Sequence, residues 1–204
     1  MSDNLTYTRR FSAPEIDRRE ILRYAGVIES TPEVEGLLDQ CINEAEKQLN
    51  YKVCYGFCNI EVGESEIDLG FCKVNSSSLV KTLVGCTGAI VFCATVGVGI
   101  DRLIAKYNLI SPSKAVIMQA LGSERVEALC EVFCSEIKTD CEKQFFACTK
   151  RFSPGYGDLP LDLQREIFSY LDCQRKIGVS LGETLFMTPS KSVTAIIGLR
   201  NVNK

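Results

Sequence analysis

The residues best suited to chemistry in this sequence lie in one ten-residue block, RFSPGYGDLP, at positions 151–160. The block holds one Arg, one Tyr, two Gly and two Pro, and it shows no apolar periodicity. Because proline fixes φ and glycine permits conformations that other residues avoid, we expect a stiff, irregular loop. Arg151, Ser153 and Tyr156 would stand on this loop, where the Arg151 guanidinium can fork onto a carboxylate. The block therefore suits a small zwitterionic ligand.

A second block follows at residues 171–193. RFSPGYG followed by Leu-Pro resembles the R-x-x-P-G-Y…P loop of the activation domain of cobalamin-dependent methionine synthase. The second block matches that family in order and spacing at Leu171, Asp172, Gly178, Leu181, Glu183, Met187, Pro189, Ser192 and Val193. The stretches GAIVFCATVGVGIDRLI and ALGSERVEALCEVF also look like the small stand-alone members of the family.

The resemblance implies a definite task. In this family the activation domain binds S-adenosylmethionine beside the corrin, so that one-electron reduction of inert cob(II)alamin is trapped by methyl transfer to cobalt. The methyl donor and the cobalamin supply the reactive groups, while the protein supplies position and electrostatics. The chain would thus be an accessory part of a methyltransferase in methionine biosynthesis, with no catalytic residue of its own.

The resemblance also implies roles for particular residues. Arg151 would grip the carboxylate of the methionine moiety, and backbone groups of Ser153 and Gly155 would meet the adenosyl portion. Tyr156 would lie between the ligand and the corrin. The edge of the second block that faces the corrin would comprise Met187, Pro189, Ser190 and Ser192. Thr188 replaces a larger aromatic residue of the family at this edge, so the cobalamin contact differs in detail.

The family further places an acidic residue on a long helix near the ligand. The string LCEVF at 129–133 fits that position best, and on a helical wheel Glu131 lies at the edge of the apolar face. Glu127 lies nearer the centre of that face and is the weaker match. Such a carboxylate would hold the ligand's ammonium group or offset its sulfonium charge. The alternative is a helix-surface Glu that faces water.

Partners follow from what the sequence lacks. It contains no recognisable cobalamin-binding module, zinc-thiolate homocysteine site or folate barrel. It also stops at Lys204, before further ligand contacts of the larger family version, and shows no counterpart of that version's acidic contact near the N-terminus. We therefore expect action in trans on a corrinoid-binding methionine synthase chain that lacks its activation domain, with a flavodoxin-like electron donor.

Three alternatives remain open at this point. The chain could activate another corrinoid methyltransferase protein, or it could be a non-catalytic, cysteine-rich structural or redox protein. It could also be a free-standing methyltransferase, for which only tyrosine and carboxylate side chains are available as the base.

Composition bounds the class of protein. With 204 residues, the chain 1–204 is expected to form a single domain. A net charge of −3 argues against nucleic-acid binding, which needs a basic face. The polar N-terminal segment is not a signal peptide, so we expect a cytoplasmic protein. Residues 82–100 are uncharged, but glycines and threonines interrupt them, which favours a buried strand over a membrane span.

Eleven cysteines occur together with no histidine. An odd number without an export signal indicates reduced thiols, and the lack of histidine excludes an imidazole base and mixed Cys/His zinc sites. Cys130, Cys134, Cys141 and Cys148 are spaced to share one face of a helix. We interpret them as core residues rather than as a metal or redox stripe, and we expect no metal site.

The periodicity and the breaker residues predict the elements. Ser12 and Glu15 form a capping box for a helix to about Tyr24, and Thr31-Pro32 begins a helix to about Leu49, so that about 1–50 is a helical part. The remaining expectations are paired strands at 51–61 and 65–69, a helix at 76–84, a buried strand at 88–95, a glycine turn and a helix from about 100, a long helix at 113–149, a helix at 161–171, and closing strands at 183–187 and 192–198. Without a β-α-β repeat, the predicted class is α+β, with a mixed or antiparallel sheet flanked by helices and the ligand loop and closing strands at about 150–200.

Overall fold

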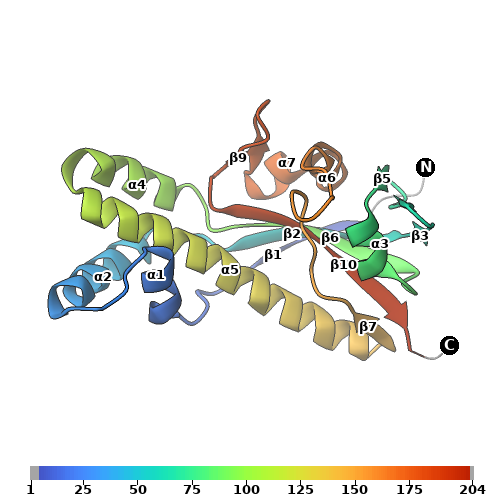
Figure 1. Cartoon of the computed structure of the whole chain (residues 1–204), viewed down its shortest axis with the longest axis horizontal. Helices are drawn as coiled ribbons and strands as arrows, with labels where there is room; N and C mark the ends of the chain where they lie inside the picture. The colour runs from blue at the N-terminus through green and yellow to red at the C-terminus, as the bar shows by residue number, and fades with distance from the viewer. Residues whose placement is uncertain (1–4, 203–204) are drawn as a thin grey trace.

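The computed structural model describes residues 5–202 and is built on an antiparallel sheet with helices on both faces (Figure 1). The five strands of this sheet, in spatial order, are β1 (Thr6–Arg10), β2 (Lys52–Asn59), β6 (Gly88–Thr95), β10 (Ser192–Asn201) and β7 (Phe146–Cys148). All four pairings are antiparallel. The predicted α+β class with an antiparallel sheet is confirmed.

Two apolar cores lie on the two faces of the sheet. The first core is covered by α1 (Arg18–Tyr24), α2 (Pro32–Ala45), α4 (Gly99–Ile110) and α5 (Pro112–Glu142). The second is covered by α3 (Ser77–Leu83), α6 (Leu163–Leu171), α7 (Cys173–Ile177), the small sheet β3 (Glu61–Val62), β4 (Glu66–Asp68) and β5 (Lys73–Asn75), and the hairpin β8 (Ser180–Leu181) and β9 (Met187–Thr188).

Strand β6 belongs to both cores, which explains its uninterrupted apolar sequence. Ile90 and Phe92 face the first core, whereas Val91 and Cys93 face the second. A strand that is buried on both faces has no polar side to alternate with. The predicted buried strand is confirmed, and no helix within residues 5–202 has both the length and the apolarity to cross a membrane.

Helix α5 is the longest element and runs diagonally across the sheet (Figure 1). Its Phe133 ring packs against Phe92 and Tyr55, with ring centroids 4.8 and 5.2 Å apart. The helix ends at Glu142, earlier than the predicted 149, because residues 146–148 turn back and pair with Leu199–Asn201 of β10. Competition from a distant strand therefore overrides the helical periodicity at this end.

The N-terminal part differs from the prediction in two ways. It begins with the edge strand β1, which pairs with β2, and its residues 1–4 lie outside the described residues. Helix α1 is capped by Asp17, whose side chain accepts a hydrogen bond from the Glu20 N–H, so the predicted capping box at Ser12 is wrong. The cap at Thr31 is confirmed, although α2 ends at Ala45, before the predicted Leu49.

Two further strand predictions need correction. Residues 51–61 and 65–69 pair only where Glu61 of β3 meets Asp68 of β4. The main strand of the first range, β2, lies between β1 and β6 instead. Residues 183–187 form mainly the turn between β8 and β9, closed by a hydrogen bond from the Gly182 N–H to the Phe186 carbonyl. Both errors concern which segments pair, which local sequence does not specify.

The cysteines lie mostly in the cores. Cys130 and Cys141 are buried with Phe133 and Ile137, and Cys134 and Cys148 pack against the same cluster, which confirms the core interpretation. The shared helix face holds only for the first three, because Cys148 lies on strand β7. Within residues 5–202, no group of three or more Cys, Asp or Glu side chains is arranged to hold a metal ion.

A buried ion pair fixes the segment that leads into α1. Glu124 and Arg125 of α5 are almost fully buried and pair with each other at 2.5 Å. Arg125 also donates to the carbonyls of Pro14 and Glu15, at 2.7 and 2.6 Å, and Glu124 accepts from the Asp17 N–H. These bonds keep residues 14–17 out of a helix, so that α1 begins only at Arg18 rather than directly after Ser12.

We predict that Arg125→Met strongly destabilises the fold. The substitution leaves the Glu124 carboxylate buried without a cation, and breaking such a pair costs about 3–5 kcal/mol. Urea denaturation measures the free energy of unfolding. The double variant Glu124→Gln/Arg125→Met should lose much less, because it buries no charge; equal losses in the single and double variants would contradict the prediction.

Candidate functional site

The site begins with the free edge of β10. Its residues 199–201 pair with β7, and Ile196 exchanges two 2.8 Å hydrogen bonds with Phe152, but the strand has no such partner at 192–194 in the described part of the chain. Peptide groups alternate in direction along a strand, so Thr194 points its N–H and C=O the same way as Ile196, away from β6. An open stretch of strand edge is thus available at Thr194.

The loop at 151–159 is closed on itself beside this edge. The Gly155 N–H donates to the Leu159 carbonyl at 2.9 Å, and the Tyr156 N–H donates to the Ser153 carbonyl at 3.2 Å. Gly155 has a φ of 89°, a region that favours glycine. The predicted irregular loop is confirmed. The Gly155 N–H already donates a hydrogen bond within this turn, so it is not free to donate to a ligand.

Asp158 ties the loop to the second core. Its carboxylate accepts hydrogen bonds from the Ser76 hydroxyl and from the N–H groups of Ser77 and Ser78, the latter two at 2.8 and 3.0 Å. These bonds, led by the one from Ser76, hold the pKa of the Asp158 carboxyl below its usual range. The loop is therefore anchored at the start of α3 as well as on β10.

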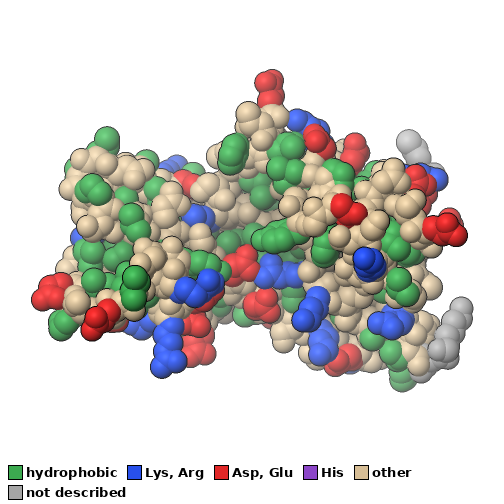
Figure 2. Space-filling view, viewed as in Figure 1, with side chains coloured by type: hydrophobic (Ala, Val, Ile, Leu, Met, Phe, Trp, Pro, Cys, Tyr) green, Lys and Arg blue, Asp and Glu red, His purple; other side chains and the backbone are tan. Residues whose placement is uncertain are grey.

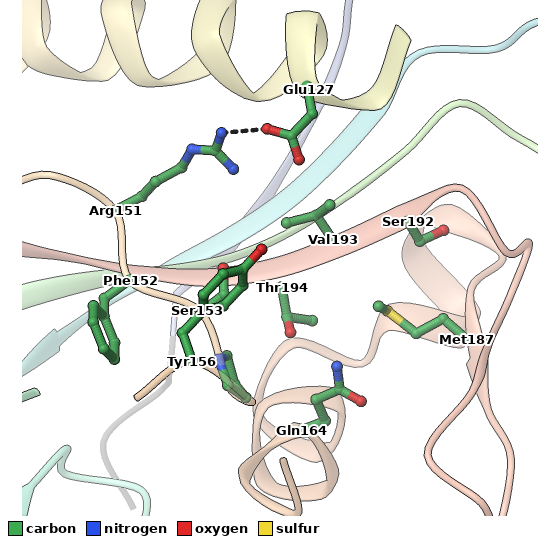
Figure 3. Close-up of a pocket in the computed structure, with 11 residues that line it drawn as sticks. Glu127, Arg151, Phe152, Ser153, Tyr156, Gln164, Met187, Ser192, Val193 and Thr194 are labelled. Carbon is green, nitrogen blue, oxygen red and sulfur yellow. Dashed lines mark hydrogen bonds and ion pairs between the residues drawn. The ribbon is translucent and has the colours of Figure 1, made fainter. Parts of the chain in front are cut away.

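A cavity of about 390 Å³ lies between α5, this loop, α6 and the free edge of β10 (Figure 3). We call it the β10 cavity. It is lined by Glu127, Arg151, Phe152, Ser153, Pro154, Tyr156, Gln164, Met187, Ser192, Val193 and Thr194. Figure 2 shows the same face of the molecule hollowed between the α4–α5 layer and the layer of α6 and α7.

An ion pair crosses the upper wall of the β10 cavity. Arg151 donates to Glu127 and also to Glu131, the second bond being 3.1 Å long (Figure 3). Burial by itself disfavours the charge on Arg151, but the hydrogen bond to Glu127 and the two carboxylates hold its pKa above the usual value. Arg151 is therefore a permanent cation, held in place by two acidic side chains.

Two polar atoms on the opposite wall lack partners. Gln164 Oε1 and Thr194 Oγ1 are buried, and neither has a hydrogen-bond partner among the described residues. Both side chains line the β10 cavity, on α6 and on β10 (Figure 3). A buried polar atom without a partner costs about 1–3 kcal/mol, so a ligand that supplied partners would bind favourably here.

The structure brings together some of the predicted site residues and not others. Arg151, Ser153, Tyr156, Met187 and Ser192 all line the β10 cavity. The other predicted residues do not line it: Glu131, Gly155, Pro189 and Ser190. Ser190 lines a neighbouring cavity that shares Ser192.

Helix α5 presents Glu127, rather than Glu131, to the cavity. The Glu131 side chain is 72 % exposed and, within residues 5–202, it forms its ion pair with Arg151. Its role as a ligand contact stays a prediction. The position of Glu127 on the helical wheel, near the centre of the apolar face, indicates that its side chain points inward to the cavity.

Sequence reasoning missed Gln164 and Thr194. Gln164 lies on the buried side of α6 with Leu163 and Ile167, and a polar residue on an apolar helix face is a usable signal. Thr194 follows Ser192 by two residues on a strand, which places both on the same face. Neither residue belongs to the motif blocks, which is why they were overlooked.

The structure is thus an α+β domain with a charged cavity beside an open strand edge. A family model described as "Vitamin B12 dependent methionine synthase, activation domain" matches residues 77–202, which include every residue that lines the β10 cavity. The chain belongs to this family.

Solved structures support the fold. The chain is similar to one described as "Crystal Structure of the MetH Reactivation Domain bound to AdoHcy", with a TM-score of 0.66 and 14 % identity over 97 % of this chain and 79 % of that chain. At this level of identity the likeness establishes the shared fold. No curated protein sequence matches significantly.

We predict a pH-dependent effect of Asp158→Asn. An unfolded Asp titrates near about pH 3.9, and the folded carboxyl titrates lower, so its stabilisation is complete above about pH 4 and is lost as the pH falls further. The difference in Tm between wild type and variant should therefore be constant from pH 7 to 5 and shrink from pH 4 to 2. Thermal unfolding over this range measures it, and a difference independent of pH would contradict the prediction.

Proposed function

We propose that this chain binds S-adenosylmethionine in the β10 cavity and serves the reductive reactivation of a cobalamin-dependent methionine synthase. The observation that carries the proposal is the pairing of a charged wall, Arg151 and Glu127, with a wall of unpartnered polar atoms on Gln164 and Thr194. S-adenosylmethionine would supply the methyl group, and cobalamin on a partner protein would supply the cobalt that accepts it after one-electron reduction.

The charged wall matches the amino-acid part of the ligand. A zwitterion brings one carboxylate and one ammonium group, and Arg151 and Glu127 offer the complementary charges side by side. Arg151 can release Glu127 to the ligand's ammonium while it keeps Glu131 as a partner. The exchange leaves each charge compensated, so the protein need not bury a lone ion.

The opposite wall matches the adenosyl part. Thr194 offers its hydroxyl, and its N–H and C=O at the strand edge, while Gln164 Oε1 accepts a hydrogen bond from a ribose hydroxyl or an amine. Apolar contacts come from Phe152, Val193 and Met187. This combination of a mostly apolar lining with a few fixed polar groups is usual for cofactor sites.

The mouth of the β10 cavity suits a large planar partner group. Tyr156, which lines the cavity, and Phe186, which precedes the lining residue Met187 in the chain, are 69 % and 78 % exposed, although large aromatic side chains are usually covered. By the family resemblance, Tyr156, Met187, Pro189, Ser190 and Ser192 would face the corrin of the partner. The partner would be a corrinoid-binding methionine synthase chain without this domain, acted on in trans, and a flavodoxin-like protein would supply the electron.

Most of the thiols give the redox alternative little support. Cys54 is the exception, because hydrogen bonds with Cys173 and Cys93 lower its pKa, although its side chain is fully buried in the second core. All eleven cysteines are free, which suits a cytoplasmic protein. Burial raises the pKa of Cys134 to about 11 and that of Cys58 to about 12, so these thiols are poor nucleophiles at neutral pH. The other alternative, activation of a different corrinoid methyltransferase protein, is distinguished by an assay with different corrinoid partners.

We predict that Arg151→Met weakens the binding of S-adenosylmethionine about ten- to hundredfold. The substitution removes a charge-assisted contact worth about 1.5–3 kcal/mol but keeps the aliphatic stem. Titration calorimetry measures the affinity. Arg175→Met, which removes an exposed arginine of α7, is the matched control and should bind as wild type does. Equal affinities of the wild type and the Arg151 variant would refute this role of Arg151.

We also predict that the chain accelerates formation of methylcobalamin on a partner. The partner, as cob(II)alamin, is mixed anaerobically with reduced flavodoxin and S-adenosylmethionine, and absorbance follows the methylcobalamin product. Arg151→Met should slow the reaction at limiting ligand. A rate that is the same with and without the chain would exclude the methionine synthase tested, and acceleration only with another corrinoid protein would identify the alternative target.

A further inference from the structure

Lys191 has an unusual path across α5. It directly precedes Ser192 at the start of β10, and its aliphatic stem lies on Gly122 of α5. A Cβ at Gly122 would lie 2.9 Å from Lys191 Cγ, which is closer than side chains pack, and 2.8 Å from Ile100 Cγ1. The glycine in the middle of the long helix is therefore explained by these close approaches, since glycine otherwise weakens a helix.

This path delivers the ammonium group to a second cavity beside the ligand site. Lys191 Nζ donates to the Ser123 hydroxyl at 2.9 Å. Lys191 and Ser123 line a cavity of about 550 Å³, which we call the Lys191 cavity. Glu127 and Ser192 line both this cavity and the β10 cavity, so the two spaces adjoin along the same walls.

The charge of Lys191 is not compensated by a carboxylate at close range. Within residues 5–202, no carboxylate oxygen lies within 4.0 Å of its Nζ, whereas Arg151 has both Glu127 and Glu131. Burial lowers the pKa of Lys191, with only a weaker opposing effect from Asp101. A half-buried ammonium that donates to a hydroxyl instead of a carboxylate is poorly solvated, and an anion would stabilise it.

We propose that Lys191 is a second cation for the α-carboxylate of the adenosyl ligand, in addition to Arg151. This inference rests on the proposed function. The carboxylate is the one anionic group of S-adenosylmethionine, and Lys191 is the cation beside the site that no protein carboxylate occupies. The geometry assigns Gly122 and Ser123 as positioning residues: one makes room for the stem, and the other orients the ammonium.

The test compares two ligands that differ in the carboxylate alone, S-adenosylmethionine and its decarboxylated form, by titration calorimetry. Lys191→Met should weaken the binding of S-adenosylmethionine about tenfold, the effect of one charge-assisted hydrogen bond, and leave the decarboxylated ligand unchanged. Lys81→Met, which removes an exposed lysine of α3, is the matched control and should change neither affinity.

Each outcome decides the matter. Loss of affinity for S-adenosylmethionine alone supports the proposal. An equal loss for both ligands shows that Lys191 merely shapes the cavity and overturns it, as does no loss for either. Because Lys191→Met removes no buried ion pair, the Tm of this variant should match that of wild type. Ser123→Ala is a second, milder variant, and it too should weaken the binding of S-adenosylmethionine but not of the decarboxylated ligand. If wild type binds S-adenosylmethionine while Lys191→Met has no effect, only this inference fails; if wild type binds neither ligand, the proposed function fails with it.

Discussion

The incomplete pairing of β10 is the constraint on which the site depends. The strand is paired with β6 along residues 192–199, but on its other side it meets β7 only at 199–201 and Phe152 only at Ile196. An unpaired strand edge normally invites association, and proteins cover or shorten it. Here the loop at 151–159 covers part of the edge and leaves the stretch at Thr194 open as one wall of a cavity. The same loop supplies the cation, so strand edge and charge are brought together by one short segment.

Helix α5 connects stability with the site. Its Glu124–Arg125 pair is buried and holds the N-terminal segment, while Glu127, one turn further on, faces the β10 cavity. Phe133 packs against the sheet another two turns along. Because these residues share one helix, the carboxylate that faces the β10 cavity is positioned by core packing rather than by a loop. Sites built on regular elements hold their geometry more tightly than sites built on loops alone.

The two cations near the β10 cavity, Arg151 and Lys191, differ in how their charges are compensated. Arg151 is matched by two carboxylates, whereas Lys191 relies on a serine hydroxyl. The site therefore contains two kinds of cation. Arg151 is held in an ion pair, whereas Lys191 donates to a hydroxyl and is paired with no carboxylate within residues 5–202. The polar atoms of Gln164 and Thr194 add acceptors and a donor on the far wall. Together these groups present charges of both signs and several hydrogen-bonding atoms to the two cavities.

The sequence by itself determined the class of fold, the buried strand at 88–95 and the irregular loop at 151–159, because glycine, proline and apolar runs act on the local conformation. The spacing of the two motif blocks determined the family. Only the tertiary structure decided which strands pair, that residues 14–17 stay outside the first helix, and that residues 146–148 form a strand of the sheet instead of extending α5. It also decided that Glu127 faces the cavity and that Gly122 admits Lys191. These features depend on contacts between segments far apart in the chain, and a local pattern carries no information about which distant atoms will compete for a hydrogen bond, a charge or a space.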